Sequence, residues 1–382
     1  MPKPVAISKF LPALRIPPSD QTLLRKLATT LVTHDLEQYN SLSISKDGHP
    51  DARVWKPTRK AEGLRIYRER PSSASKSTPE IPSLLLLGSV NGTLDDIMYA
   101  AVALTDESLK IKSSCIRDGV VDSKVLGELV CPTVDDPFHH VSLQWRLYEH
   151  CDYVTLDTAG MMQTPWGERV GYSVSHSVGF PQLPAFTDLG ITRGNMSVCS
   201  LFHQKPNNTV ECYTRGFFDM STHGNAVLAL QTIATQWLSL SRNMQCAQMK
   251  KLAWYLRQNN FNMDMALLTP AATLPIQCKS KRTTPTCRVC AKSFSFLPGR
   301  KKFCNSCDHA VCSRCYVKTR VFVLAPDHSS IHQNKRAVCS HCIHKVVQSD
   351  AAAIARDELL RMGSSSYRND VMCRGRGNGR LE

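Results

Sequence analysis

Short segments in which hydrophobic and polar residues alternate, each ending at turn residues, dominate the chain between residues 54 and 214. This pattern is typical of strands in an antiparallel sheet. The predicted strands are Leu64–Tyr67, Leu84–Val90, His140–Tyr148, Tyr153–Ala159, Arg169–Val178, Met196–His203 and Thr209–Thr214. We therefore expect one large antiparallel sheet in this part of the chain.

Helical patterns flank and interrupt these segments. Apolar residues recur at helical spacing from Ser19 to Tyr39, and a shorter helix is predicted from Thr93 to about Thr105. A long amphipathic helix is predicted from Ser221 to Arg257, with one side formed by Leu230, Ile233, Ala234, Trp237 and Met244. The order predicts an α+β domain with a helix-grip architecture, in which the last helix covers a curved sheet.

Length and composition limit the classes of protein that fit. The chain has 382 residues, of which 42% are hydrophobic, enough for a large core plus a small module or for two ordinary domains. No apolar run reaches the roughly 18 residues that a membrane-spanning helix needs, and the N-terminus lacks a secretory pattern. We expect a soluble, cytoplasmic protein, in which clustered cysteines bind metal rather than form disulfides.

Eight of the 16 cysteines form four Cys-x-x-Cys pairs, separated by 13, 4 and 23 residues. A Cys-x-x-Cys turn supplies two thiolates to one metal ion, and zinc takes four ligands tetrahedrally. Four pairs therefore predict two closed structural zinc sites, which leave no position for a catalytic water. The candidate ligands are Cys287, Cys290, Cys304, Cys307, Cys312, Cys315, Cys339 and Cys342.

The gap of four residues between the second and third pairs separates this pattern from related fingers. A RING finger needs a shorter separation with a histidine ligand there, and a PHD finger places histidine where Cys312 stands. The cysteine-only pattern resembles the FYVE-type finger. Spacing alone leaves the pairing open, but the resemblance implies one zinc on Cys287, Cys290, Cys312 and Cys315. It implies the other on Cys304, Cys307, Cys339 and Cys342.

FYVE-type fingers recognise phosphatidylinositol 3-phosphate through a basic strand that carries paired histidines just before the third cysteine. Here that stretch contains Arg300, Lys301 and Lys302 but no histidines, so the resemblance is to a degenerate finger. Phe296 and Leu297 lie just before it and resemble the loop that inserts into the membrane. An apolar tip beside cations is typical of an interfacial anchor.

The charge of the chain is concentrated around the cysteines. Residues 279–345 contain 14 Lys or Arg and 2 Asp or Glu, whereas the first 278 residues contain 27 and 25. A basic module beside a nearly neutral domain indicates an anionic partner, either phospholipid or nucleic acid. Charge alone does not choose between them, and a merely solvated basic face is the alternative.

Segments before the finger resemble START-like domains that are joined to FYVE-type fingers in oomycete proteins. They are Trp55, Gly63–Tyr67, Gly88–Val90, Thr93–Tyr99, Asp152–Tyr153, Gly167–Tyr172 and Arg215–Phe217. The resemblance implies a cavity between sheet and C-terminal helix that encloses one lipid. Trp237 and Met244 are candidate lining residues, with ordinary core packing as the alternative, and the sequence identifies no other cavity residue.

These observations predict a non-catalytic, zinc-binding adaptor that binds a lipid and associates with phosphoinositide-containing or other anionic membranes, peripheral on endosomes. The alternative is a finger that binds protein or nucleic acid without specific lipid binding. No motif of hydrolase or transferase chemistry occurs, so no catalytic residue is predicted. The expected organisation is an N-terminal tail (1–19), a START-like domain (20–258), a linker (259–286), the finger (287–347), and a short helix with a basic tail (348–382).

Overall fold

The computed structural model describes residues 6–71, 82–164, 166–219, 226–259, 284–294, 301–324 and 331–364. Most of the predicted linker and the end of the basic tail lie outside the described residues. The same holds for Phe296, Leu297 and Arg300, the predicted insertion loop and the first residue of the basic strand.

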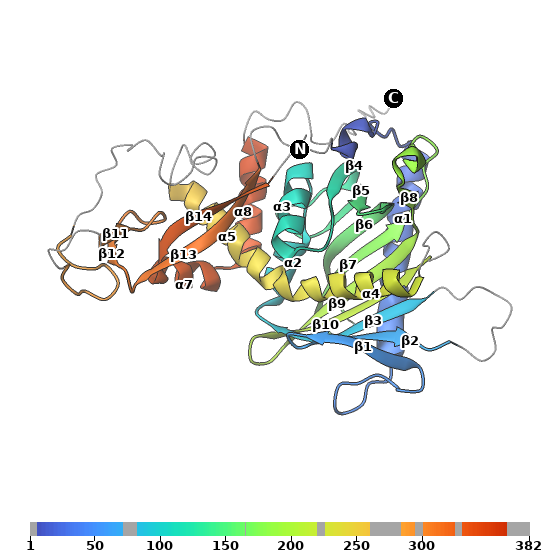
Figure 1. The fold of residues 1–382 in the computed structure, drawn as a ribbon, viewed down its shortest axis with the longest axis horizontal. Coiled ribbons are helices and arrows are strands. Elements are labelled where there is room, and N and C mark those ends of the chain that lie inside the picture. Colours follow the sequence, from blue (N-terminus) through green and yellow to red (C-terminus); the bar gives the residue numbers. More distant parts are fainter. Residues whose placement is uncertain are drawn as a thin grey trace, which may run out of the picture.

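A ten-stranded sheet dominates the N-terminal part of the molecule, which we call the sheet domain (residues 6–259; Figure 1). Its order is β1-β2-β3-β10-β9-β7-β6-β5-β4, antiparallel throughout, with the short β8 parallel to β6. The strands are β1 (Trp55–Ala61), β2 (Leu64–Glu69), β3 (Ser83–Asn91), β4 (Asp122–Val130), β5 (His140–Tyr148), β6 (Cys151–Gln163), β7 (Arg169–Ser177), β8 (Thr192–Arg193), β9 (Met196–Lys205) and β10 (Thr209–Phe218).

All seven predicted strands are present, and the large sheet contains three more that the sequence pattern missed. β1 is an edge strand with a single buried residue, Trp55, so it shows no alternation. In β4 the register shifts twice, between Val125 and Gly127 and between Glu128 and Val130. Such irregularities break the period of two on which the prediction depends. The third, β8, has only two residues and is too short to show a pattern.

Helices cover both faces of the sheet. One face packs against α1 (Pro18–Ser41), and the other packs against the remaining helices (Figure 1). These are α2 (Leu94–Ala101), α3 (Asp106–Ile116), α4 (Ala226–Trp237), η3 (Leu238–Arg242) and α5 (Asn243–Asn259). Short 3-10 turns are η1 (Ile7–Phe10) and η2 (Thr187–Leu189). None of the described helices is both long and apolar enough to cross a membrane.

One predicted helix is shorter in the structure and another is divided. The helix predicted from Thr93 to Thr105 ends at Ala101, and Thr105 instead caps a further helix, α3, that was not predicted, through reciprocal hydrogen bonds with Ser108. The predicted C-terminal helix consists of α4, η3 and α5 in succession. The predicted α+β class and helix-grip arrangement are confirmed, because α4 crosses the sheet on the face opposite α1 (Figure 1).

The interior strand β3 packs against helices on both faces of the sheet. Leu84 and Leu86 pack beneath α2 and α5, whereas Leu85 and Leu87 pack beneath α1, and all four are buried. Successive side chains of a strand point to opposite faces, so a run of four leucines fits only a strand that is covered on both sides. Residues 7–16, within the predicted N-terminal tail, also contribute to a core, with Leu11 buried near β4 and β5.

The cysteine-rich region, which we call the finger (residues 284–348), contains two small hairpins and a helix. Its elements are β11 (Lys301–Phe303), β12 (Ala310–Cys312), β13 (Tyr316–Leu324), β14 (Ile331–Cys339) and α7 (Ser340–Gln348). The final helix α8 (Ala351–Ser364) returns to the sheet domain, where Ala351, Ile354 and Ala355 join its largest core. The finger is thus flanked on both sides by helices of one packed unit.

A buried lysine holds this junction together. Lys251 of α5 is 1% exposed, and its Nζ lies 2.5 Å from an Asp96 carboxylate oxygen in α2. The same ammonium donates to the carbonyl oxygen of Ser349, 2.7 Å away, between α7 and α8. Nearby, the indole Nε1 of Trp254 donates to Asp357 of α8 at 2.7 Å. Helix α5 therefore contacts α2 of the sheet domain, the turn between α7 and α8, and α8 itself.

Candidate functional site

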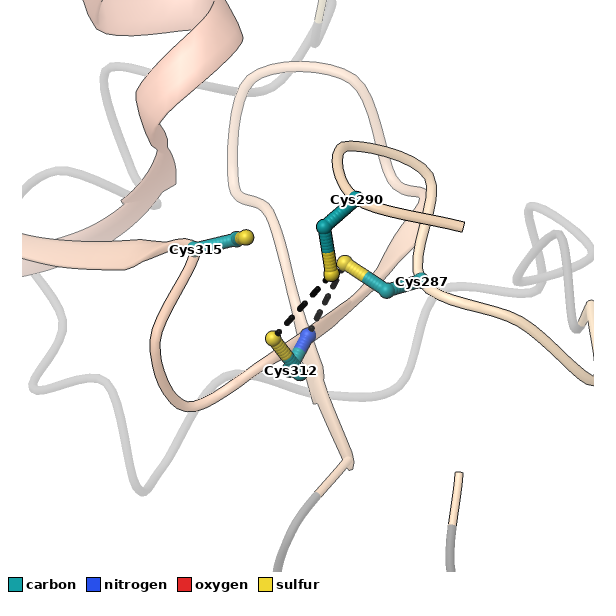
Figure 2. Close-up of side chains that lie close together, drawn as sticks. All are labelled: Cys287, Cys290, Cys312 and Cys315. Carbon is teal, nitrogen blue, oxygen red and sulfur yellow. Dashed lines mark hydrogen bonds between the residues drawn. The ribbon is translucent and has the colours of Figure 1, made fainter. Parts of the chain in front are cut away.

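The eight cysteines of the finger gather into two groups of four, and in each group all Sγ atoms lie within 4.8 Å of one another. One group contains Cys287, Cys290, Cys312 and Cys315, whose sulfurs point toward a common centre (Figure 2). The other contains Cys304, Cys307, Cys339 and Cys342. Each group takes alternate pairs along the chain, which is the interleaved grouping that the resemblance implied.

The sulfur positions fit a tetrahedral metal site. With a zinc–sulfur distance of about 2.3 Å, the sulfurs of a tetrahedral site lie about 3.8 Å apart. The Sγ atoms of Cys290 and Cys312 are 3.8 Å apart, and those of Cys307 and Cys339 are 4.0 Å apart. Each group can therefore hold one metal ion with four thiolates and no open position.

Backbone groups around the sulfurs favour the thiolate form that a metal needs. The N–H groups of Cys312 and Cys339 donate to the sulfurs of Cys287 and Cys304, at 3.4 and 3.2 Å. Desolvation opposes ionisation of Cys287, but its backbone donors outweigh it and lower the pKa of this thiol to about 6. The backbone of the Cys-x-x-Cys turns therefore also stabilises the thiolate form of the cysteines.

The predicted basic strand is β11, paired with β12 so that Lys301 lies opposite Cys312. Lys302 is exposed, whereas Lys301 is half-buried with its Nζ 5.3 Å from the ring centre of Phe294. Phe294 packs against the cysteine-containing core of the finger. The part of the predicted anionic site that the structure describes therefore has one free lysine and one that rests on an aromatic ring.

A second cationic surface lies on the β13–β14 hairpin, and the sequence analysis did not single it out. Arg320 is directly opposite Lys335, with Lys318 on the same face of the hairpin, and all three side chains are exposed. On the other face, Val321, Arg336 and Val338 are buried. We call Lys318, Arg320 and Lys335 the cationic face; none of them pairs with an acidic side chain of the described residues.

The sheet domain contains a cavity of about 970 Å³ between the sheet and the helices α3 and α4. Leu86, Val198 and Phe202 line it from the sheet, while Ile233 and Trp237 line it from the helices. Trp237 is thus a lining residue, as one of the two alternatives proposed. Met244, the other candidate, is buried in the adjoining core and does not border this cavity.

One wall of the cavity is charged. The Arg146 guanidinium borders the cavity and lies 2.6 Å from an Asp157 carboxylate oxygen, which also accepts a hydrogen bond from Ser175. Burial opposes ionisation of Asp157, but the Arg146 charge and these hydrogen bonds hold its pKa below the usual value. Lys112 also lines the cavity, and desolvation, followed by the Arg146 charge, lowers its pKa to about 8.

The sequence contains a signal for this wall. In β5, Val141, Leu143 and Trp145 form one apolar face, and the alternate positions include the polar residues Gln144 and Arg146. In the structure Gln144 is buried, and Arg146 is half-buried beside the cavity. A strand that is covered on both sides but is polar on one face is typical of a binding cavity.

Comparisons with known proteins add a limited likeness. No family model and no curated protein matches the chain. Among solved structures, human StAR-related lipid transfer protein 5 covers 59% of this chain and 98% of its own, with 14% identity and a TM-score of 0.41. Human STARD10 covers 55% of this chain and 78% of its own, with 12% identity and a TM-score of 0.38.

The lipid transfer and protein localization domain of human StarD13 covers 50% of this chain and 88% of its own, with 13% identity and a TM-score of 0.36. These TM-scores are too low to support an argument. The fold of the sheet domain is therefore defined by its own strand order, by helix α4 across the sheet, and by the cavity between them.

Proposed function

We propose that this protein is a lipid-binding adaptor that encloses one lipid in the cavity of its sheet domain. The cavity itself is the observation that carries the proposal. Its volume of about 970 Å³ lies at the upper end of the range for small-molecule sites, and its walls combine large apolar side chains with a few polar groups. The resemblance of the sequence to START-like domains points to the same ligand class. No catalytic residue is proposed.

We also propose that the two cysteine groups hold zinc and that the finger, of the FYVE type, addresses the protein to anionic membranes. The four-thiolate sets and the sulfur spacing of 3.8 to 4.0 Å support zinc. Arg300, Lys301 and Lys302 would meet a phosphoinositide headgroup, while Phe296 and Leu297 would enter the bilayer. Endosomal membranes that display phosphatidylinositol 3-phosphate are the proposed location.

Lipid capture by the full chain tests the first proposal. The protein is incubated with mixed-lipid vesicles, separated from them, and weighed by native mass spectrometry. We expect one lipid per chain in the wild type and none in Ala229→Trp, which places an indole in the cavity from α4. The control is Gln231→Trp, at an exposed position of the same helix. Equal capture by the wild type and Ala229→Trp would count against the cavity as the binding site.

Vesicle binding tests the second proposal. The zinc-loaded protein is mixed at physiological salt with vesicles that contain or lack phosphatidylinositol 3-phosphate, alongside a Lys301→Ala/Lys302→Ala variant. Selective binding that the variant loses supports headgroup recognition. Absence of binding to every vesicle would leave the membrane proposal without support.

A finger that binds nucleic acid or an acidic protein is the second candidate function, and the cationic face favours it. Three exposed basic side chains on one flat hairpin can meet a row of phosphates or carboxylates. Binding of this kind should fall steeply with salt and persist when Phe296 and Leu297 are changed to Asp, whereas membrane anchoring should be lost in that variant.

A further inference from the structure

A row of hydroxyl groups crosses the sheet where it faces the cavity. Ser173 of β7 is paired directly with Ser200 of β9, and Ser200 is paired with Thr214 of β10. All three residues line the cavity. We call Ser173, Ser200 and Thr214 the hydroxyl row. Three adjacent strands therefore present hydroxyls side by side in a position where most strands of a buried sheet present aliphatic groups.

The hydrogen-bonding capacity of the row is only partly used within the protein. The hydroxyl oxygens of Ser200 and Thr214 are 2.8 Å apart, so one of the two donates to the other. No partner for the Ser173 hydroxyl lies in the described part of the chain. A hydroxyl has one donor and two acceptor positions, and a polar group in an apolar site costs free energy unless it is paired. The row therefore has capacity left for a bound molecule.

The row continues into the charged wall. Ser175, two residues beyond Ser173 on the same face of β7, donates to Asp157, which is paired with Arg146. Together the hydroxyls and the ion pair form a polar strip along one side of a cavity whose opposite side includes Ile233 and Trp237. A ligand that fills the cavity thus meets hydrogen-bonding groups along one edge and apolar groups along the other.

The cavity has no excess of positive charge. The cations Lys112 and Arg146 are opposed by Asp118 and Glu149, which also border the cavity, and by Asp157 behind Arg146. An anionic headgroup would leave an uncompensated negative charge in a buried site, and such a charge is costly. A head without net charge avoids that cost and can still use the donors and acceptors of the polar strip.

We propose that the cavity selects a lipid with an uncharged head that carries several hydroxyl or amide groups, and that this head lies along the hydroxyl row. The inference rests on the proposed lipid-binding function and narrows it to a ligand class. A lipid with only one polar atom leaves most of the strip unpaired, so it binds less tightly.

Three probes with the same acyl chain test the ligand class. Monopalmitoylglycerol has two free hydroxyls, palmitate has a carboxylate, and methyl palmitate has no donor. Their affinities for the full-length, zinc-loaded protein are measured by competition with a fluorescent lipid. We expect monopalmitoylglycerol to bind at least tenfold more tightly than either of the others. Equal or tighter binding of palmitate or methyl palmitate would overturn the inference while leaving a lipid-binding cavity in place.

Variants of the row test the position of the head. Ser173→Ala and Thr214→Val each remove one hydroxyl, and each should weaken binding of monopalmitoylglycerol about two- to tenfold without changing that of methyl palmitate. Ser197→Ala is the matched control, because Ser197 lies on β9 but faces away from the cavity. If the wild type and all three variants bind monopalmitoylglycerol with equal affinity, the lipid head does not lie along the hydroxyl row. Failure of every probe to bind would overturn this inference, whereas lipid capture by mass spectrometry decides separately on the proposed function.

Discussion

The sheet domain and the finger are stabilised by different means. Four buried leucines of β3 and the clusters on both faces of the sheet give the sheet domain a large hydrophobic core. The finger has a core in which Cys287, Cys304, Cys339 and Cys342 stand among a few valines. A module of this size buries too little apolar surface to be stable alone, so bonds to the proposed metal ions would replace the missing core.

The two regions nevertheless share one helix. Leu252 and Leu256 of α5 belong to the core of the finger, whereas Cys246 and Ala247 of the same helix belong to the core of the sheet domain. Helix α3 lies between them, lining the cavity through Leu109 and contacting the β13–β14 hairpin. Helices α5 and α3 therefore connect the finger to the cavity, and loss of the proposed metal can act on the cavity through them.

Removal of the metal should have the largest effect. Chelation, or Cys304→Ser, removes a contribution on the order of 10 kcal/mol per structural zinc site, so β13, β14 and α7 should lose protection from hydrogen exchange. Strands β5 to β7 should keep theirs, because their core contains none of these ligands. Cys131→Ser, which changes a cysteine outside both groups, is the control. A finger that stays protected after chelation would contradict the metal requirement.

Breaking the buried ion pair at the junction should come next. Lys251→Met leaves the Asp96 carboxylate without its partner, which typically costs about 3 to 5 kcal/mol of unfolding free energy. Chemical denaturation measures the loss, and adding Asp96→Asn should restore much of it. Lys26→Met, at an exposed position of α1, should change the stability by less than about 0.5 kcal/mol. No recovery in the double variant would indicate that packing, not charge, is lost.

A buried histidine should make the sheet domain sensitive to acid. Desolvation outweighs the attraction of Asp157 and lowers the pKa of His140 from 6.5 to about 4. Between these pH values the unfolded chain binds the proton and the folded chain does not. The contribution of His140 to stability should therefore fall by up to about 3 kcal/mol as the pH drops from 6.5 to 4, and this contribution should change no further below pH 4. The stability measured by chemical denaturation across this pH range should depend less steeply on pH in His140→Gln than in the wild type.

The smallest effect concerns the cationic face. Arg320→Thr removes a charge that lies directly opposite Lys335, so the finger should gain roughly 0.2 to 1 kcal/mol of stability. The same change should weaken binding to anionic vesicles about fivefold. Arg59→Thr is the control, because Arg59 lies on edge strand β1 opposite Ile66 and has no like charge across from it. A finger that loses stability on this change would contradict the repulsion between the two cations.

Local patterns predicted the elements that obey them. Alternation identified β5 at both ends, and the spacing of the cysteines identified the residues that the fold gathers into two groups. The same patterns missed β1, which has one buried side chain, and β4, whose register shifts remove the alternation. They also extended α2 from Ala101 to Thr105, because no helix-breaking residue lies between these positions, and they missed α3, which begins after the Thr105 cap.

The sequence by itself determined seven strands of the sheet, the positions of the long helices and the residues of both cysteine groups, because each depends on neighbours or on ligand spacing along the chain. Tertiary structure decided the rest. Strand order sets Ser173, Ser200 and Thr214 side by side, and it turns Arg146 toward a cavity rather than solvent. Lys251 meets Asp96 and Ser349 only after the chain has folded back on itself. Such contacts join residues that are far apart in sequence, so no local pattern records them.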